Sequence, residues 1–475
     1  MTLYGEEDYP NDQAERRILF LLNELELHLE HAYGPSGYTQ EGLSYLAYTM
    51  SLLGPAVYSA NDMNITVLDR AWSRPDWTNL ALHVISFRKQ RNALQFGVSD
   101  STYAYNGFLP YIFNSTSDIN RKAALRWFYD RTMGIKSKRA AFDGKDKCAA
   151  LLFYPYEIDE QHPSQVFPRS MSMLVDNLDG YYAFRNRYQD HNDVLIGFTS
   201  RNRCHAGWNA EETFALSILS HDTTWTQMPG KEYKTFRLTR KFTTPLVDGL
   251  PREPKRNQLN SQTKFVKSFT NQTGGYVSID ASRNFRITSA QRNMFVDMIQ
   301  RNSIDTIIAI DDYFQDNISH YWHWQLSPNV FETEFLLLDN ENQLATFIIR
   351  GRNQTWLKAW LYNHQDATFN NTNETIRIVK NGFQASFQIV MALGSGIEPI
   401  AFRRSNGIQL ENVIIDFNRL SDGLLPIETS VISIIIIIIT ITITTICICL
   451  LILLFLLQKR RKNSRISPTS EQQIK

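Results

Sequence analysis

The sequence predicts an α+β protein followed by a C-terminal transmembrane helix, and three observations support this. Apolar residues recur at helical spacing up to about residue 150, whereas short β-rich segments take over beyond residue 170. Residues 431–457 then form a run of 27 residues without a charge. Helices followed by a long series of strands indicate an α+β protein with two folded domains ahead of the uncharged run.

The N-terminal region is expected to be a helical domain over residues 1–160. Its first amphipathic helix lies between a cap at residues 11–12 and the Gly-Pro pair at 34–35. The apolar residues of this helix recur at three- and four-residue spacing, at Ile18, Leu21, Leu22, Leu25 and Leu29. Residues 43–53, 77–91 and 120–133 show the same period, so each is expected to form a further helix.

An antiparallel β domain is expected over residues 170–420, after a linker near residues 162–169. Short β-rich segments in this region are separated by Gly, Asn, Asp and Pro. The segments are residues 181–184, 194–198, 214–219, 264–269, 276–279, 294–299, 306–310, 334–338, 346–350, 375–379 and 387–392. His320 and His323 are expected to pack among tryptophans rather than to act as ligands.

The uncharged run at 431–457 is expected to cross a membrane once. A hydrocarbon core about 30 Å thick requires roughly 20 helical residues, and the run exceeds that length. A basic cluster follows directly at residues 459–462. Because positive charge flanks the cytoplasmic side of transmembrane helices, residues 458–475 are expected to form a cytoplasmic tail.

Glycosylation sequons agree with an N-terminal domain that is luminal or extracellular. All seven N-x-S/T sequons precede the uncharged run, at Asn64, Asn114, Asn271, Asn317, Asn353, Asn370 and Asn373. The first residues, however, lack the basic and apolar regions of a signal peptide. Either Met1 is not the native start, which we favour, or the chain is tail-anchored in the cytosol. The sequence leaves the ER, the Golgi and the cell surface open as locations.

Charge gives no indication of a nucleic-acid partner. The tail holds six of the 49 Lys and Arg residues and one of the 48 acidic residues, which leaves 43 basic and 47 acidic residues before it. Local basic clusters at 136–139 and 231–241 are either solvated faces or the lining of a groove for an anionic polymer. Cys148 and Cys204 are the only cysteines outside the uncharged run, and one disulfide between them is possible.

Four local motifs occur in a fixed order along the chain. Residues 37–48 read GYTQEGLSYLAY, and residues 96–103 read FGVSDSTY. The third motif runs from Cys-His-Ala-Gly at 204–207 through Phe214 to Gly-Lys-Glu-Tyr at 230–233. The fourth is Gln-Arg-Asn at 291–293, followed by the apolar-Asp segment 307–311. In order and spacing these motifs resemble the heparinase II/III-like polysaccharide lyases, and among them the animal dermatan-sulfate epimerases.

This resemblance implies a fold and a reaction. The fold would be a partial α/α toroid followed by an antiparallel β-sandwich domain. The reaction would be proton abstraction at C5 of a hexuronate in an anionic polysaccharide of the dermatan, chondroitin or heparan type, with C5-epimerase and lyase outcomes both open. By the motif match, Tyr45 and His205 would be catalytic, and Glu41, Asp100 and Tyr103 would shape the substrate site.

Departures from the family pattern leave other functions open. The upstream toroid half with its Asn/His motif is missing, and no His-x-His-x-Asp precedes Phe214. No histidine stands at the family's downstream metal position, near residues 237–242, so no metal cofactor is expected. Weak activity or none is therefore expected. The alternatives are a catalytically inactive relative that binds glycans and a structural or receptor-like cell-surface glycoprotein of another family.

Overall fold

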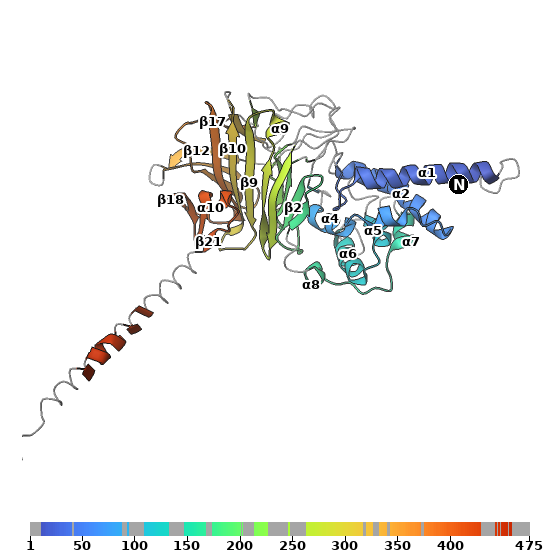
Figure 1. Cartoon of the computed structure of the whole chain (residues 1–475), viewed down its shortest axis with the longest axis horizontal. Coiled ribbons are helices and arrows are strands. Elements are labelled where there is room, and N and C mark those ends of the chain that lie inside the picture. Colours follow the sequence, from blue (N-terminus) through green and yellow to red (C-terminus); the bar gives the residue numbers. More distant parts are fainter. Residues whose placement is uncertain are drawn as a thin grey trace, which may run out of the picture.

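The computed structural model places helices on one side of the molecule and sheets on the other (Figure 1). It describes residues 11–39, 42–87, 93–94, 109–132, 147–167, 173–200, 202, 213–226, 246–247, 263–316, 320–325, 332–339, 343–371 and 375–428. Towards the C-terminus it also describes residues 442–443, 445–446, 448–454 and 456–457, all of them helical.

Helices occupy the described chain before its first strand. They are α1 (Asn11–Ala32), α2 (Leu43–Asp62), α3 (Asp69–Ser73), α4 (Trp77–Val84), α5 (Leu109–Ser115), α6 (Ile119–Thr132), α7 (Lys147–Phe153) and α8 (Pro163–Val166). Two short helices follow among the strands, α9 (Ser282–Phe285) and α10 (Phe417–Ser421). The predicted first helix and the predicted helix at 120–133 correspond to α1 and α6 within two residues.

Two helix ends differ from the prediction. The predicted end of α2 at residue 53 is wrong, because the helix continues through Gly54 and Pro55. A Cβ at position 54 would lie 2.2 Å from the ring of Tyr111, so close packing of α2 on α5 favours continuing the helix despite the proline. In the other case, α4 ends at Val84 rather than at residue 91, because Ile85 turns extended and pairs with Ala93.

The strands form four antiparallel sheets. The first sheet has the order β1-β2-β3-β4-β5 and contains Met173–Asp176, Tyr181–Arg185, Leu195–Thr199, Ala215–Ser220 and Thr223–Thr224. The large sheet has the order β12-β13-β14-β17-β10-β9-β8-β7 and contains Glu332–Asp339, Leu344–Arg350, Thr355–Leu361, Gln384–Ser395, Ile304–Gln315, Ser289–Asp297, Gly274–Asp280 and Lys264–Asn271.

Two smaller sheets complete the described β structure. One has the order β15-β16-β11-β6 and contains Ala367–Asn371, Thr375–Lys380, His320–Gln325 and Leu246–Val247. The other has the order β18-β19-β20-β21 and contains Ala401–Arg404, Gly407–Leu410, Val413–Asp416 and Ile427–Glu428. His320 is buried and stacks on Phe314 with ring centroids 5.7 Å apart, as expected of a packing residue.

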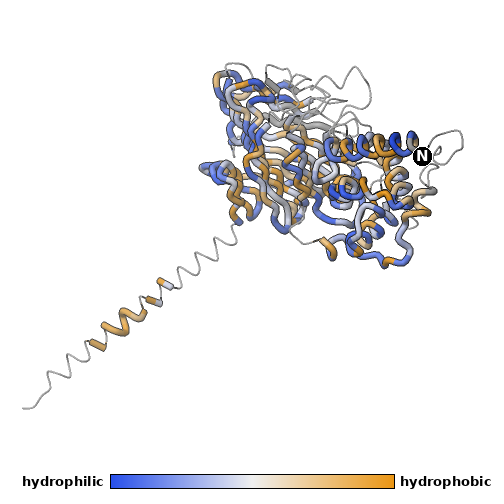
Figure 2. Tube along the Cα trace, turned by 45° about the vertical axis from the view of Figure 1, so that its right-hand side comes forward, coloured by the Kyte–Doolittle hydropathy of each residue, from blue (hydrophilic) through white to orange (hydrophobic). Residues whose placement is uncertain are grey.

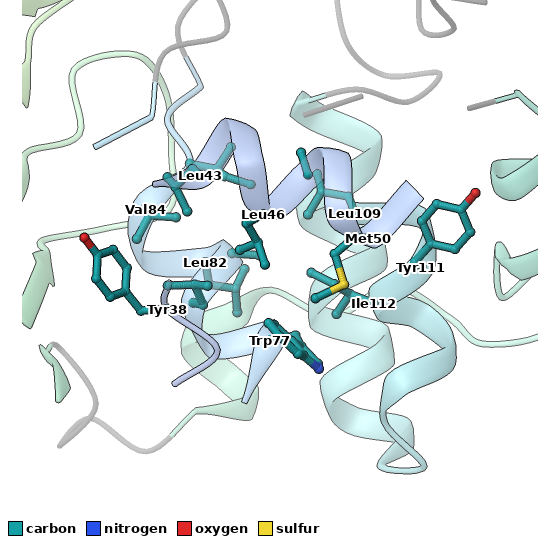
Figure 3. Packing of buried hydrophobic residues seen from close by; sticks show 14 of the residues in the cluster. Tyr38, Leu43, Leu46, Met50, Trp77, Leu82, Val84, Leu109, Tyr111 and Ile112 are labelled. Atoms are coloured by element: carbon teal, nitrogen blue, oxygen red, sulfur yellow. The ribbon is translucent and has the colours of Figure 1, made fainter. Parts of the chain in front are cut away.

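The first sheet is buried on both faces. On β2, Tyr181 and Ala183 belong to the hydrophobic cluster of the helices (Figure 3 shows part of this cluster). Tyr182 and Phe184, which alternate with them, belong to the cluster shared with the large sheet. Because successive residues of a strand point to opposite faces, this sheet is a middle layer between the helices and the large sheet.

The far face of the large sheet has a separate core. Ile307 and Ala309 of β10 pack there with Ile408 and Ile415 of the small sheet β18–β21 and with α10. Ile308 and Ile310, on the opposite face of β10, pack towards the first sheet. The layers are therefore helices, first sheet, large sheet and small sheet. Figure 2 shows hydrophobic (orange) and hydrophilic (blue) residues interspersed along the chain in the helices and the sheets.

The predicted combination of helices with antiparallel sheets is confirmed. The partial toroid, the domain limits and the disulfide between Cys148 and Cys204 stay predictions. In the part of the chain that the structure describes, every helix is too short or too polar to cross a membrane.

A buried ion pair fastens the helices to the first sheet. The guanidinium of Arg185 on β2 lies 2.9 Å from the Asp193 carboxylate, and both side chains are almost fully buried. The same guanidinium donates to the carbonyl oxygens of Leu82 at 2.8 Å and Ile85 at 2.7 Å, at the C-terminal end of α4. A cation is favoured there because the helix dipole is negative at that end. Arg185 therefore provides hydrogen bonds to backbone carbonyls at the end of α4 and holds that end on the sheet.

Substituting Arg185→Met should destabilise the protein by about 3–5 kcal/mol, because it removes the buried cation beside the Asp193 carboxylate and leaves it only Arg187, a 29% exposed side chain at 3.4 Å. Urea unfolding followed by circular dichroism measures the change. Arg70→Met is the matched control, since Arg70 pairs with Glu30 at 2.9 Å while its own side chain is 82% exposed. An exposed pair contributes about 0–1 kcal/mol. Equal losses in the two variants would contradict the role given to Arg185.

Candidate functional site between the helices and the first sheet

Tyr45 lies in the first turn of α2. The helix begins after Gly42, whose φ of 93° favours glycine. Leu43 and Leu46 are buried in the helical core, where Figure 3 shows them near Leu82 and Val84 of α4. Tyr45 is half-buried, and Tyr48, one turn further on, is 66% exposed. Tyr45 therefore stands at the border between the packed side of α2 and its open side.

The loop before α2 is fixed to the first sheet by a buried carboxylate. Asp176, at the end of β1, accepts hydrogen bonds from the Ser36 hydroxyl at 2.6 Å and the Ser36 amide at 3.2 Å. Its other oxygen accepts from the amides of Leu178 at 3.1 Å and Asp179 at 3.0 Å. Burial, and then the charge of Asp179, raise the pKa of Asp176, while the donors around it oppose that shift.

Gly34 allows this loop to approach the sheet closely. A Cβ at position 34 would lie 2.1 Å from a carboxylate oxygen of Asp176 and 2.4 Å from one of Asp179. Further along the loop, Tyr38 stacks on Tyr181 of β2 with centroids 3.9 Å apart and an interplanar angle of 1°. The loop that leads to α2 is thus held against the β1–β2 end of the first sheet.

The same end of the sheet holds the chain just before His205. Asn202 donates from its backbone amide to the Asp179 carbonyl at 3.1 Å and from its side chain to the Asn177 carbonyl at 2.7 Å. Its amide oxygen accepts from the Ser200 hydroxyl at 2.7 Å.

The other end of this segment is held by both the first sheet and the large sheet. The Phe214 amide donates to the Thr199 carbonyl at 2.8 Å, and the Phe214 carbonyl accepts from Arg292 on β9 at 2.6 Å. Arg292 also forms a buried ion pair with Asp312 on β10. Arg292, part of the fourth motif, therefore supports the segment of the third motif through packing and hydrogen bonds.

The structure describes Tyr45 among the predicted site residues. Glu41, Asp100, Tyr103 and His205 lie outside the described residues, so their placement stays a prediction. Both ends of the segment that contains His205 are nevertheless fixed by the first sheet, and Asn202 bonds to the β1–β2 turn that also holds the loop before Tyr45.

Sequence reasoning missed a polar cluster at this edge. Asn284 of α9 is buried, and its amide group donates to the hydroxyls of Thr213 at 3.3 Å and of Thr263. Thr263 in turn donates to the Ser200 carbonyl at 2.9 Å. These residues are separated by up to 84 positions, and nothing in their local sequence indicates that they meet. They join α9 to the two ends of the segment containing His205.

Asp311, the acidic residue of the fourth motif, faces away from this site. It stands on the side of β10 that carries Ile307 and Ala309, the side that packs towards β18–β21. Burial, and then the neighbouring charge of Asp312, raise the pKa of Asp311 to about 6, and hydrogen bonds from Gln388 and Asn293 oppose this shift. Asp311 is thus a buried carboxyl of the fold, remote from the helix–sheet edge.

No cluster of three His, Cys, Asp or Glu side chains suited to a metal occurs within the residues that the structure describes. Because the predicted family positions near 204–212 and 237–242 lie outside them, the expectation of no metal cofactor stays a prediction.

Comparisons with known proteins identify the fold. No protein-family model and no curated protein matches the sequence. Among solved structures, heparan sulfate lyase HepC from Pedobacter heparinus matches with a TM-score of 0.54 and 14% identity, over 85% of this chain and 63% of that one. A heparinase III matches with a TM-score of 0.56 and 10% identity, over 83% and 62%. A second heparinase III, with methylated lysines, gives 0.57 and 9%, over 86% and 60%.

The chain has a heparinase III-like fold. The structural similarity establishes that fold. At identities of 9–14% it establishes nothing about activity. The chain spans about three fifths of the length of these structures. The resemblance to polysaccharide lyases is therefore confirmed, whereas the closer resemblance to dermatan-sulfate epimerases is not.

The pKa of Asp311 predicts a dependence of stability on pH. Its folded pKa of about 6 lies above the ordinary value of 3.8, so the folded state binds this proton more tightly than the unfolded state. The stabilising effect of this protonated carboxyl is fully present when the pH is below the ordinary pKa of 3.8. It is lost as the pH rises through about 6. Asp311→Asn should therefore gain stability relative to the wild type as pH rises, by up to about 3 kcal/mol.

Thermal unfolding of both proteins on either side of that pH range measures the difference. Asp159→Asn is the control, because Asp159 is exposed. A difference between wild type and Asp311→Asn that stays constant with pH would exclude the raised pKa.

Proposed function

We propose that this protein acts on an anionic glycosaminoglycan by abstracting the proton at C5 of a hexuronate. The observation that carries the proposal is the heparinase III-like fold, in which one end of the first sheet holds both the loop before Tyr45 and the chain before His205. Substrates of the dermatan, chondroitin and heparan type all contain the required uronate.

The proposed reaction needs a proton-transfer pair and a way to neutralise a carboxylate. The C5–H bond lies next to the uronate carboxylate, so the electron pair left at C5 delocalises into that group. Breaking the C4–O bond then forms a C4=C5 double bond, and the leaving oxygen takes a proton. Protonation of C5 on the opposite face gives the epimer instead. Lyase and epimerase outcomes thus diverge after a shared intermediate.

Tyr45 and His205 are the residues that we assign to proton transfer. A phenol and an imidazole can each donate or accept a proton once the site shifts their pKa values. Glu41, Asp100 and Tyr103 are assigned to shaping the substrate site. Without a metal, cationic side chains would have to neutralise the uronate carboxylate, which is why slow turnover is expected.

Exposed apolar residues on the helices support the partial toroid as part of this proposal. On α1, Phe20 is 62% exposed and Leu21 is 58% exposed, and on α2 Leu52 is 59% exposed. On α7, Leu151 is 69% exposed. In an α/α toroid each helix packs against neighbours on two sides, and further helices would cover these residues.

Membrane anchoring by residues 431–457 is also part of the proposal. Ile443 is 57% exposed and Leu451 is 66% exposed, and the other large apolar residues described between them and Leu457 are more than half exposed. Helical apolar side chains without packing partners would be covered by lipid. The basic cluster at 459–462 would then lie on the cytoplasmic side.

Tyr45→Phe and His205→Ala should each lower C5 proton exchange about 10²–10⁴-fold, because each removes a group that transfers the proton. Deuterium incorporation from solvent at C5 measures exchange on desulfated dermatan, on chondroitin and on heparan. The absorbance of unsaturated uronate, followed in parallel, separates lyase from epimerase. Turnover should persist in the presence of a chelator.

Matched controls are available within the chain. Tyr48→Phe changes a phenol one turn along α2, and His191→Ala changes an exposed histidine. Both should leave exchange unchanged. Wild-type protein without exchange on any of the three polysaccharides would contradict the proposed reaction, whereas exchange that survives in Tyr45→Phe would contradict only the assignment of Tyr45.

The proposed topology predicts N-glycosylation of the N-terminal domain. Asn64, Asn114, Asn353 and Asn370 are exposed, and Asn271 is half-buried, so these sequons are accessible. Asn317 and Asn373 lie outside the described residues. Expressed with a signal sequence in secretory cells, the chain should lose apparent mass on endoglycosidase treatment. A C-terminal tag should stain only after permeabilisation. An unglycosylated N-terminal domain that lies in the cytosol and is sensitive to protease there would contradict the topology.

A further inference from the structure

The outer face of the small sheet β18–β21 carries an apolar row. Phe402 lies opposite Gln409, Gln409 opposite Ile414, and Ile414 opposite Ile427. Directly opposed residues share a face of the sheet, so this row crosses all four strands, with apolar side chains on β18, β20 and β21 and Gln409 on β19. The opposite face, which includes Ile408, packs on the large sheet. The row therefore faces away from the core.

A groove of about 840 Å³ lies over this row. Phe402, Ile414 and Ile427 line it, together with Arg404 and Asp416. Phe402 is 47% exposed, an unusual environment for a phenylalanine in a folded domain.

Exposed apolar residues concentrate in the part of the chain that contains β18–β21. Among the described residues of 173–428, eight large apolar side chains are exposed, and five of them fall within residues 397–425. Besides Phe402, they are Ile397, Ile400, Leu424 and Leu425. Ile397, at 85%, is the most exposed of these. An exposed cluster of this kind indicates a contact surface rather than scattered surface residues.

Arg404 supplies a cation at one end of the apolar row. Its side chain is exposed, and its Nε donates to the Gln409 side-chain oxygen at 2.7 Å, which holds the guanidinium over the sheet. Asp416, across the groove, already accepts from the amides of Asn418 at 2.9 Å and Arg419 at 3.2 Å as the cap of α10. A guanidinium beside an apolar surface suits phosphate groups at a lipid boundary.

The chain ties this face to the proposed membrane anchor. β21 ends at Glu428, three residues before the uncharged run begins at residue 431. Three residues span at most about 10 Å, so the groove lies within reach of the headgroup layer. In Figure 1, β18, α10 and β21 lie close together at the end of the molecule from which the C-terminal helical residues extend.

We propose that the outer face of β18–β21 rests in the phospholipid headgroup layer, with Phe402 and Ile414 at the acyl boundary and Arg404 on lipid phosphate. An apolar surface typically penetrates this boundary by about 5–10 Å. This inference rests on the proposed anchor. Its consequence is that the domain is held in a fixed orientation on the membrane rather than moving freely about a linker.

Photo-cross-linking of the full chain in phosphatidylcholine nanodiscs tests the inference. Benzoyl-phenylalanine replaces Phe402 in one protein and Phe20 in the control, and the lipid carries an alkyne tag. Phe20 is a 62% exposed phenylalanine on α1. It belongs to the helical layer, which lies across the first and large sheets from β18–β21 (Figure 1). Lipid should be captured at 402, captured less when Arg404→Glu is added, and not captured at 20.

Carbonate extraction of cell membranes separates the two proposals. A chain that resists extraction but captures no lipid at 402, or captures equally at 20, overturns the inference and leaves the anchor standing. A chain that carbonate releases overturns the anchor and the inference together.

Discussion

Burial of the first sheet on both faces is the constraint on which the rest of the structure depends. Tyr181 and Tyr182 are neighbours in the chain and are both fully buried, one in the helical core and the other in the core of the sheets. A sheet covered on both sides has no face left for polar groups. Two charged side chains at its strand ends, Asp176 and Arg185, instead hold the loop before α2 and the end of α4.

The same constraint explains why the candidate site lies at the end of the first sheet. Functional side chains need water and substrate, which the buried faces exclude. The strand ends are the places where the chain emerges from the middle layer, and there Asn202 and Phe214 hold the segment that contains His205. The pair of Arg292 and Asp312 extends this support into the large sheet. Packing of the middle layer thus determines which loops can meet Tyr45.

Sequence patterns identified elements where one physical signal dominated. The helical period found α1 and α6 closely, and short apolar runs found many of the strands. The helical pattern gave a wrong end for α2, because Gly54 packs closely on Tyr111 and the helix continues past the predicted end. The strand pattern failed for β14, whose residues Thr355–Leu361 are apolar on both faces, so no polar alternation marks the strand.

The sequence predicted the residues of the candidate site less well than it predicted the fold. Motif order predicts roles for Tyr45 and His205, which stay predictions. Asn202, Thr263 and Asn284 were not found, because polar residues far apart in the chain give no periodic signal before the fold unites them. The adjacent carboxyls of Asp311 and Asp312 make the same point, since strand alternation sends one to each face of the large sheet.

Fold and chemistry are therefore specified by different residues in this chain. A heparinase III-like fold persists at 9–14% identity because burial requires only apolar side chains at alternate positions, a condition that many sequences satisfy. Proton transfer instead requires particular groups at particular atoms, and a single substitution removes it. The fold consequently holds the loop before Tyr45 at one end of the first sheet, whereas the proposed reaction depends on the individual side chains that meet there.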